Sequence, residues 1–414
     1  MTVEADRTMT EGQRWWYFII VLLCGIAMSM VLMAVSPSMP LLMELYGVGA
    51  GVASWFMAVG SLTSMVISLT AGIIQSKINP KGLIILGTAC CLASTGMCML
   101  AGESIALMIA GRLVFGVGMG CANAAGPTLV MALWDDPARR SIPMAIWACN
   151  SAFGSLIILN TFTPAEPFLG GWAAGFAISG IGALIALVLI VFFARIPRKR
   201  LIAVSRGEGA STASTFKAIR NPNVILVFVL FLSTAFIYST WSAMAPTYMQ
   251  TGVGMEPGPA NSIASISTLT GIAGSLVAGF VLGRVKNQPL ASLFIMILAA
   301  AAGSLSYVFS EPALATFESA FIGFTVNAAL PAFMLCVQWA VNDLSEMGAA
   351  MALTSSFGVG LGGMVSIPIV GAIYDATGSW AIATIPIAVM SAIGILAAVI
   401  FTIRCGKKSV AALS

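Results

Sequence analysis

Twelve long apolar stretches, separated by mostly short polar segments, make up most of this chain. The hydrocarbon core of a bilayer is about 30 Å thick, so a helix that crosses it needs about 20 apolar residues. The pattern therefore predicts an all-α membrane protein with twelve transmembrane helices, at about 15–37, 49–74, 82–102, 104–132, 141–163, 172–194, 223–249, 260–283, 290–310, 313–340, 348–374 and 380–403.

Composition supports this reading. The chain is 59% hydrophobic and only 8% charged, against about 25% charged residues in an ordinary soluble domain. The first apolar stretch exceeds the roughly 7–15 residues of a signal-peptide core, and no A-x-A site follows it. We therefore expect the first stretch to remain in the protein as a membrane span.

The two halves of the chain repeat each other at an offset of 204 to 207 residues. Asn123-Ala-Ala-Gly-Pro127 returns as Asn327-Ala-Ala-Leu-Pro331, and Met144-Ala145 returns as Met351-Ala352. The long polar segment 195–222 separates the halves. Such repeats place a solute site near the middle of the membrane, between halves that open it alternately to each side.

The repeat and the charge pattern together divide the chain into five segments. We expect a cytoplasmic N-terminus at 1–14, a six-helix bundle at 15–194, a basic cytoplasmic linker at 195–222, a second six-helix bundle at 223–403 and a cytoplasmic tail at 404–414.

Basic residues fix the predicted orientation. Threading the stretches through a membrane puts all Lys and Arg residues except Arg112 on one side, and the opposite loops carry acids such as Glu103 and Glu166. Because positive loops stay in the cytoplasm, we expect cytoplasmic termini in a cell (inner) membrane protein. The net charge of +4 then reflects contact with anionic lipid, not nucleic-acid binding.

Several function classes lack the residues they need. The chain has no His, its eight Cys residues lack metal-type spacing, and no G-x-x-x-x-G-K-[ST] phosphate loop occurs. An intramembrane enzyme would need a nucleophile with a base, or a metal cluster, at membrane depth. We therefore expect no enzyme activity, no metal and no cofactor.

Arg112 is the first candidate for a solute-binding residue, because an intramembrane charge must face protein or water. A guanidinium can hold an anionic solute bidentately, or it can fix helix packing. Asn123 lies three turns further on the same face of the helix, and Asn150 lies at a similar depth on the next span. For both Asn residues, hydrogen bonding between helices is the alternative to solute binding.

The second half offers further candidates. Glu318 is a candidate for proton coupling, although its place near the predicted helix start also allows its carboxylate to reach the outer interface. Asn327 lies nine residues further on, on the opposite face. Tyr238 and Trp241 fall inside the seventh span and are candidates for shaping the solute site.

Several motifs resemble those of the major facilitator superfamily of secondary transporters. Arg112-Leu-Val-Phe-Gly116 is similar to the family's helix-4 arginine–glycine motif, and Gly371-Ala-Ile-Tyr-Asp375 to a common ending of its helix 11. The loop from Gly72 through Lys77 to Lys81 resembles a worn copy of its gating loop, with Ser76 replacing the aspartate, and Gly279 and Arg284 repeat it in the second half. The Asn-Ala-Ala-x-Pro helices look most like the cyanate-permease and related organic-anion branches.

The resemblance implies a monomeric secondary transporter that carries a small solute through the bilayer by alternating access. With Arg112 as a fixed cation, we expect that solute to be anionic and exchange or facilitated movement to prevail over proton symport. The alternative is a proton-coupled exporter of amphiphilic compounds, which the missing glycine–proline signature in the fifth span disfavours. The sequence also leaves open a third function, that of a membrane sensor that binds its ligand without transporting it.

Overall fold

The computed structural model describes residues 9–134, 137–196, 220–285, 287–341 and 347–411. The first half folds into helices only, in the described part: α1 (Glu11–Met33), α2 (Val35–Tyr46), α3 (Ala50–Ala53), α4 (Trp55–Lys77), α5 (Pro80–Met99), α6 (Ile105–Leu133), α7 (Pro137–Ala148), α8 (Asn150–Ala165), the 3₁₀ turn η1 (Gly171–Ala173), α9 (Ala174–Val188) and the π-helical turn η2 (Leu189–Phe193).

The second half is helical as well where it is described, with one π-helical segment, η4. It contains α12 (Pro222–Thr251), α13 (Pro257–Leu282), α14 (Gln288–Ser304), α15 (Pro312–Ala340), α16 (Met347–Met351), η4 (Ala352–Phe357), α17 (Gly358–Thr377), α18 (Trp380–Ala383) and α19 (Ile385–Ala411). The predicted all-α class is confirmed.

Eleven of the described helices or helix pairs are long and apolar enough to cross a membrane. The twelfth predicted span corresponds to α14, a shorter apolar helix of 17 residues, which at 1.5 Å per residue is about 26 Å long. The chain is therefore a multi-pass membrane protein with twelve apolar helical segments in the described part.

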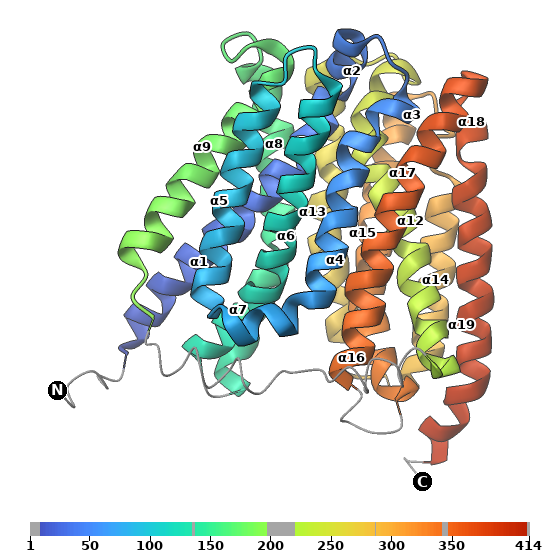
Figure 1. Ribbon diagram of the computed structural model, residues 1–414. Coiled ribbons are helices and arrows are strands. Elements are labelled where there is room, and N and C mark those ends of the chain that lie inside the picture. The colour runs from blue at the N-terminus through green and yellow to red at the C-terminus, as the bar shows by residue number, and fades with distance from the viewer. Residues whose placement is uncertain (1–8, 135–136, 197–219, 286, 342–346, 412–414) are drawn as a thin grey trace, which may run out of the picture.

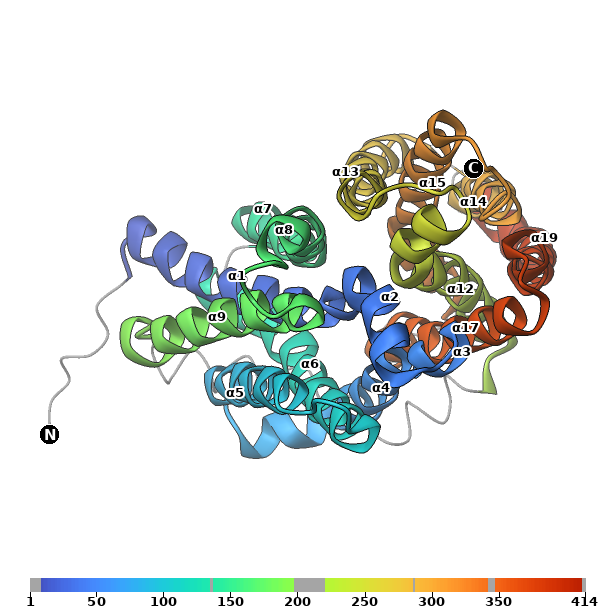
Figure 2. The same cartoon turned by 90° about the horizontal axis from the view of Figure 1, so that it is seen from above.

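The two halves form two bundles that stand side by side (Figures 1 and 2). The start of α1 and the end of α19 lie at the same end of the bundles, together with α7 and α16, and we call this end the termini side (Figure 1). The opposite end, which carries α3 and α18, is called the far side. The connection between the bundles, 197–219, lies outside the described residues.

The repeat seen in the sequence returns as matching helices. Helices α6 and α15 each have 29 residues and each contain a proline, Pro127 and Pro331. Gly116 on α6 packs on the Gly60 carbonyl and the Thr63 side chain of α4. Its counterpart on α15, Gly323, packs in the same way on Ser267 and Thr270 of α13. The same close helix crossing therefore occurs in both halves.

The repeated prolines have a local structural role. A proline inside a helix has no backbone N–H, so the carbonyl four residues earlier loses its helical hydrogen-bond donor. In α15, Pro331 frees the Asn327 carbonyl, which accepts a hydrogen bond from Ser275 Oγ on α13 at 3.0 Å. The Asn-Ala-Ala-x-Pro motif thus ties neighbouring helices together within a bundle.

Two predicted spans have different boundaries in the structure. The first span runs from Glu11 to Tyr46, well past the predicted end at 37, and is interrupted at Ala34, where Pro37 blocks the helical bond to the Met33 carbonyl. The span predicted at 290–310 ends already at Ser304, and Tyr307 beyond it adopts a left-handed backbone with φ 62°.

Candidate functional site

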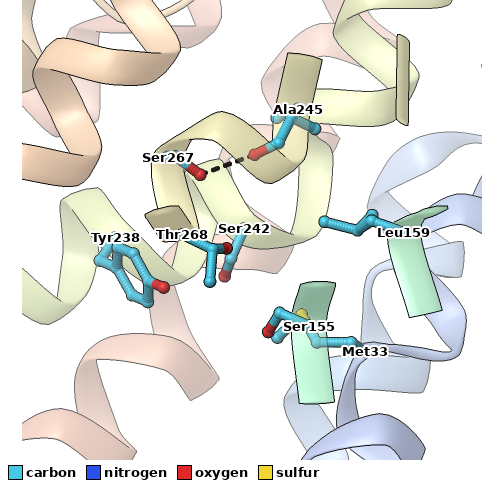
Figure 3. Close-up of a pocket in the computed structure, with 9 residues that line it drawn as sticks. Met33, Ser155, Leu159, Tyr238, Ser242, Ala245, Ser267 and Thr268 are labelled. Atoms are coloured by element: carbon cyan, nitrogen blue, oxygen red, sulfur yellow. Dashed lines mark hydrogen bonds between the residues drawn. The ribbon is translucent and has the colours of Figure 1, made fainter. Parts of the chain in front are cut away.

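A small cavity lies between the two halves of the protein. Helices α1 and α8 line it from the first half, and α12 and α13 line it from the second (Figure 3). The lining side chains are apolar or hydroxyl-bearing and carry no charge: Met33, Ser155, Leu159, Tyr238, Ser242, Ala245, Ala264, Ser267 and Thr268. We refer to this cavity as the central pocket.

The serines of the central pocket use their hydroxyl protons within their own helices. Ser155 Oγ donates to the Ser151 carbonyl at 2.9 Å, and Ser242 Oγ donates to the Ser239 carbonyl at 3.1 Å. Ser267 Oγ donates to the Ala264 carbonyl at 2.7 Å. A hydroxyl has one proton and two lone pairs, so these serines can still accept hydrogen bonds from a solute.

Tyr238 connects the central pocket to a second polar group. Its hydroxyl lies close to the side chains of Asn327 on α15 and Thr268 on α13, and Tyr238 and Thr268 lie side by side in Figure 3. Asn327 Nδ2 also donates to the Gly323 carbonyl at 2.9 Å. A side chain at Gly271 would collide with Asn327, since its Cβ would lie 2.6 Å from Nδ2. The structure therefore brings together Tyr238 and Asn327 of the predicted site residues.

Arg112 is fully buried and its guanidinium binds backbone carbonyls. Nε donates to the Phe56 carbonyl of α4 at 2.5 Å, and the two Nη atoms donate to the Val31 and Leu32 carbonyls of α1 at 2.8 and 3.3 Å. The guanidinium also lies 4.5 Å from the Phe115 ring centre. Val31 and Leu32 lie just before the break between α1 and α2, so Arg112 joins α6 to α1 and α4 beside this break.

The two asparagines predicted in the first half lie in different surroundings. Asn150 accepts a hydrogen bond from Ser29 Oγ on α1 at 3.0 Å and donates to the Trp147 carbonyl at 2.6 Å. It therefore connects α8 to α1. The side chain of Asn123 is exposed on α6, whereas Arg112 on the same predicted face is buried. Neither asparagine lines the central pocket.

Trp241 is buried away from the central pocket in an aromatic cluster. Its ring lies 5.4 Å from that of Tyr307 and 6.1 Å from that of Tyr248, and Trp380 packs against both tyrosines. Trp241 thus contributes to packing on the far side of the second bundle.

Glu318 lies next to this cluster and is only 2% exposed. Its Oε1 accepts a hydrogen bond from the Tyr307 backbone N–H at 2.5 Å. Its Oε2 lies 3.3 Å from the Tyr248 hydroxyl, whose one proton has the Phe309 carbonyl as a closer acceptor. The expectation that this carboxylate reaches the outer interface was wrong. The sequence places Glu318 close to the start of its helix and therefore near the membrane surface. In the structure, the aromatic rings and the loop after α14 cover this position.

The predicted gating residues lie at the termini side. Gly279 is in the last turns of α13, and Arg284 beyond the helix donates to the Phe280 carbonyl at 3.0 Å. Gly72 and Lys77 belong to the last turns of α4, and the structure describes only the backbone of these turns. Their side chains lie outside the described residues.

Sequence reasoning missed most of the central pocket. Ser155, Ser242 and Thr268 are single hydroxyl residues inside apolar helices, and the chain has many others that only bond their own helix. Their distinguishing property is that helices of both halves place them around one cavity. A search for the polar positions that face the partner half would have been needed to find them.

The two halves contact each other on the far side of the central pocket. Asn261 Nδ2 on α13 donates to Thr163 Oγ1 on α8 at 3.0 Å. Ser36 Oγ on α2 donates to the Ser242 carbonyl of α12 at 2.7 Å, a carbonyl that Pro246 frees from its helical bond. Thr163 lies eight residues beyond the pocket residue Ser155, which is about 12 Å along the helix.

Comparison with known proteins agrees with this architecture. The sequence profile of the Major Facilitator Superfamily matches residues 21–359. A stretch of 152 residues is 29% identical to the proton myo-inositol cotransporter hmit-1.2 of Caenorhabditis elegans. That stretch covers 36% of this chain and 22% of the relative, so the similarity spans about a fifth of the relative's length.

Proposed function

The chain belongs to the Major Facilitator Superfamily. We propose that it is a membrane transporter whose solute is a small uncharged molecule rich in hydroxyl or amide N–H groups. The observation that carries this proposal is the central pocket. Its serines have committed their protons to backbone carbonyls and offer lone pairs, so they match a solute that donates hydrogen bonds.

An anionic solute, which the sequence suggested, is supported less by this geometry. An anion accepts hydrogen bonds and would find few free donors among the pocket serines. Arg112 would have to leave three backbone carbonyls to reach it, and an unpaired buried acceptor costs about 1–3 kcal/mol. We therefore assign Arg112 to helix packing. A large amphiphilic substrate also fits poorly, because the pocket is small.

We propose that transport follows alternating access of the central pocket. Both halves line the pocket, so a relative movement of the halves changes its exposure. The contact Asn261–Thr163 lies beyond the pocket toward the far side, and Ser36 joins the halves at the pocket residue Ser242, so both contacts support a pocket closed toward the far side in this state. Ser151, one turn nearer the termini side than Ser155, is exposed, which supports a route to that side.

Glu318 remains our candidate for coupling transport to protons. It is a buried carboxyl that accepts a hydrogen bond from the Tyr307 N–H in the loop after α14 and lies 3.3 Å from the Tyr248 hydroxyl on α12. Protonation would remove the negative charge that these groups stabilise and would loosen the joint between α12 and α15. The chain is similar to a relative that is named a proton cotransporter. This similarity favours testing proton coupling before anion exchange.

Counterflow in proteoliposomes tests the solute class. The vesicles are preloaded with myo-inositol, with another neutral polyol or with a small carboxylate, and uptake of the same labelled compound is followed. We expect exchange of a neutral polyol. Tyr238→Phe and Thr268→Val should raise its half-saturation concentration up to about tenfold, the effect of one hydrogen bond of about 1.4 kcal/mol.

Tyr46→Phe is the matched control, because the Tyr46 hydroxyl has no hydrogen-bond partner among the described residues and lies outside the pocket. It should exchange the polyol like the unaltered protein. Exchange of carboxylates alone, or pocket variants that behave like Tyr46→Phe, would contradict the proposal.

A further inference from the structure

The carboxylate of Asp375 joins the two halves on the far side. Asp375 belongs to the last turn of α17, in the second half. Its Oδ1 accepts from the Ala50 N–H and its Oδ2 accepts from the Gly51 N–H, both at 2.7 Å. Ala50 and Gly51 are the first residues of α3, in the first half.

These two bonds supply a cap that the first half lacks. Helix α3 continues through Ser54 into α4, and together they start the second membrane span. The N-cap residue is Gly49, which provides no side-chain hydrogen bond. The first N–H groups of a helix have no partner within the helix and carry partial positive charge. A carboxylate from the other half therefore satisfies two of them with charge-assisted bonds.

The position of Asp375 is unfavourable for its own helix. An acidic side chain in the last turn faces the negative end of the helix dipole. Asp375 instead points at the positive end of the helix in the other half. The arrangement therefore favours contact between the halves over the stability of α17 alone.

Small residues bring the two helix ends together. A Cβ on Gly49 would lie 2.3 Å from Asp375 Oδ2, and a Cβ on Gly51 would lie 2.9 Å from the Ala372 backbone. A Cβ on Gly371 would lie 2.8 Å from the Ala50 carbonyl oxygen. Any side chain at these three glycines would push the halves apart, so the contact depends on their absence.

The internal repeat provides a comparison. The corresponding far-side contact between α8 and α13 has Gly258 at the place of Gly51, and Pro257, which has no N–H, at the place of Ala50. There the halves are joined by the neutral hydrogen bond between Asn261 and Thr163. The charged cap thus exists at one of the two related contacts.

We propose that Asp375 is a latch that holds the far side closed by capping the helix of the other half. The latch rests on the proposed alternating access, because it must break whenever the central pocket opens to the far side. Its loss should shift the equilibrium toward the far-side-open state. Asp375→Asn keeps one acceptor oxygen and should have an intermediate effect.

Thiol labelling measures this equilibrium without any solute. A single cysteine replaces Ser242, in a cysteine-free background, and an impermeant maleimide is added from the far side of oriented vesicles. We expect Asp375→Ala to label about tenfold faster than the parent, a shift of about 1.4 kcal/mol, and Asp375→Asn to fall between them. Thermal unfolding of each variant is followed in parallel to verify that it folds.

Glu311→Ala is the matched control. Glu311 is an exposed acid at the N-cap of α15 on the same side, and its side chain makes no cap bond in the described structure. It should label at the parent rate. Parent-like labelling of a folded Asp375→Ala would overturn the latch alone. A Ser242 cysteine that is never labelled from the far side in any variant would overturn alternating access itself, and the latch with it.

Discussion

Arg112 shows how a single intramembrane charge can be accommodated without a counter-ion. Its three donor groups end on three carbonyls of α1 and α4, and its plane contacts Phe115. A guanidinium suits this task because its donors form a rigid planar fork. The residue that stood out most in the sequence is thus explained by backbone carbonyls next to a helix break.

Replacing Arg112 should destabilise the fold. Arg112→Ala removes three charge-assisted hydrogen bonds that join α6 to α1 and α4, so we expect a loss on the order of 3 kcal/mol or more and a clearly lower unfolding temperature of the purified protein. Arg112→Lys should recover only part of it, because an ammonium group cannot reach all three carbonyls. Arg404→Ala, at an exposed position on the termini side, serves as the control. A stable Arg112→Ala protein that no longer binds solute would place Arg112 in the binding site instead.

Replacing Glu318 should separate coupling from solute exchange. Glu318→Gln keeps the size of the side chain and an acceptor for the Tyr307 N–H but cannot ionise. We expect counterflow of the solute to persist, while accumulation driven by an imposed pH gradient is lost. Glu311→Gln should keep both activities. Retention of pH-driven accumulation in Glu318→Gln would exclude this carboxyl as the coupling group.

At the scale of elements, paired glycines set the distances between helices. A Cβ on Gly116 would lie 1.8 Å from Thr63 Oγ1, and a Cβ on Gly323 would lie 2.0 Å from the Ser267 carbonyl oxygen. Neither helix pair can keep its crossing if these glycines carry a side chain. The two positions occupy the same place in the two halves, so the repeat preserves the crossing as well as the helix order.

We expect Gly116→Ala and Gly323→Ala each to lower stability by at least the roughly 1–3 kcal/mol typical of an overpacked interior. The comparison is Gly96→Ala on α5, where an added Cβ meets nothing within 4 Å. Unfolding temperatures of the three purified variants provide the measurement. If Gly116→Ala unfolds at the same temperature as Gly96→Ala, the close crossing of α4 and α6 is not present in the protein.

The apolar pattern predicted the helices well because each must satisfy its backbone inside the bilayer. Boundaries failed where tertiary contacts decide them. The end of α14 and the burial of Glu318 both depend on the left-handed Tyr307, whose N–H bonds to that carboxylate. Likewise, the pairing of Asn327 with Tyr238 could be suspected from the repeat, whereas the pocket serines could not.

At the scale of the whole molecule, the orientation in the membrane is a prediction from charge. The described basic residues other than Arg112 lie toward the termini side, among them Arg139 and Arg404, which positive-inside charge would place in the cytoplasm. Single cysteines at Glu103 or Glu166 should therefore react with impermeant reagents on intact cells, and cysteines at Arg139 or Arg404 should react only after permeabilisation. The reverse pattern would invert the protein and exchange its two sides.

The central claim is that one pocket between the halves becomes accessible from each side in turn. The most direct measurement places a single cysteine at Ser267 and compares its labelling from the two sides, with and without a short crosslink between cysteines at Thr163 and Asn261, whose side chains touch in the closed far side. The account predicts labelling from both sides without the crosslink, and labelling from the termini side only, with no transport, once the crosslink is formed. Unchanged far-side labelling in the crosslinked protein would contradict it.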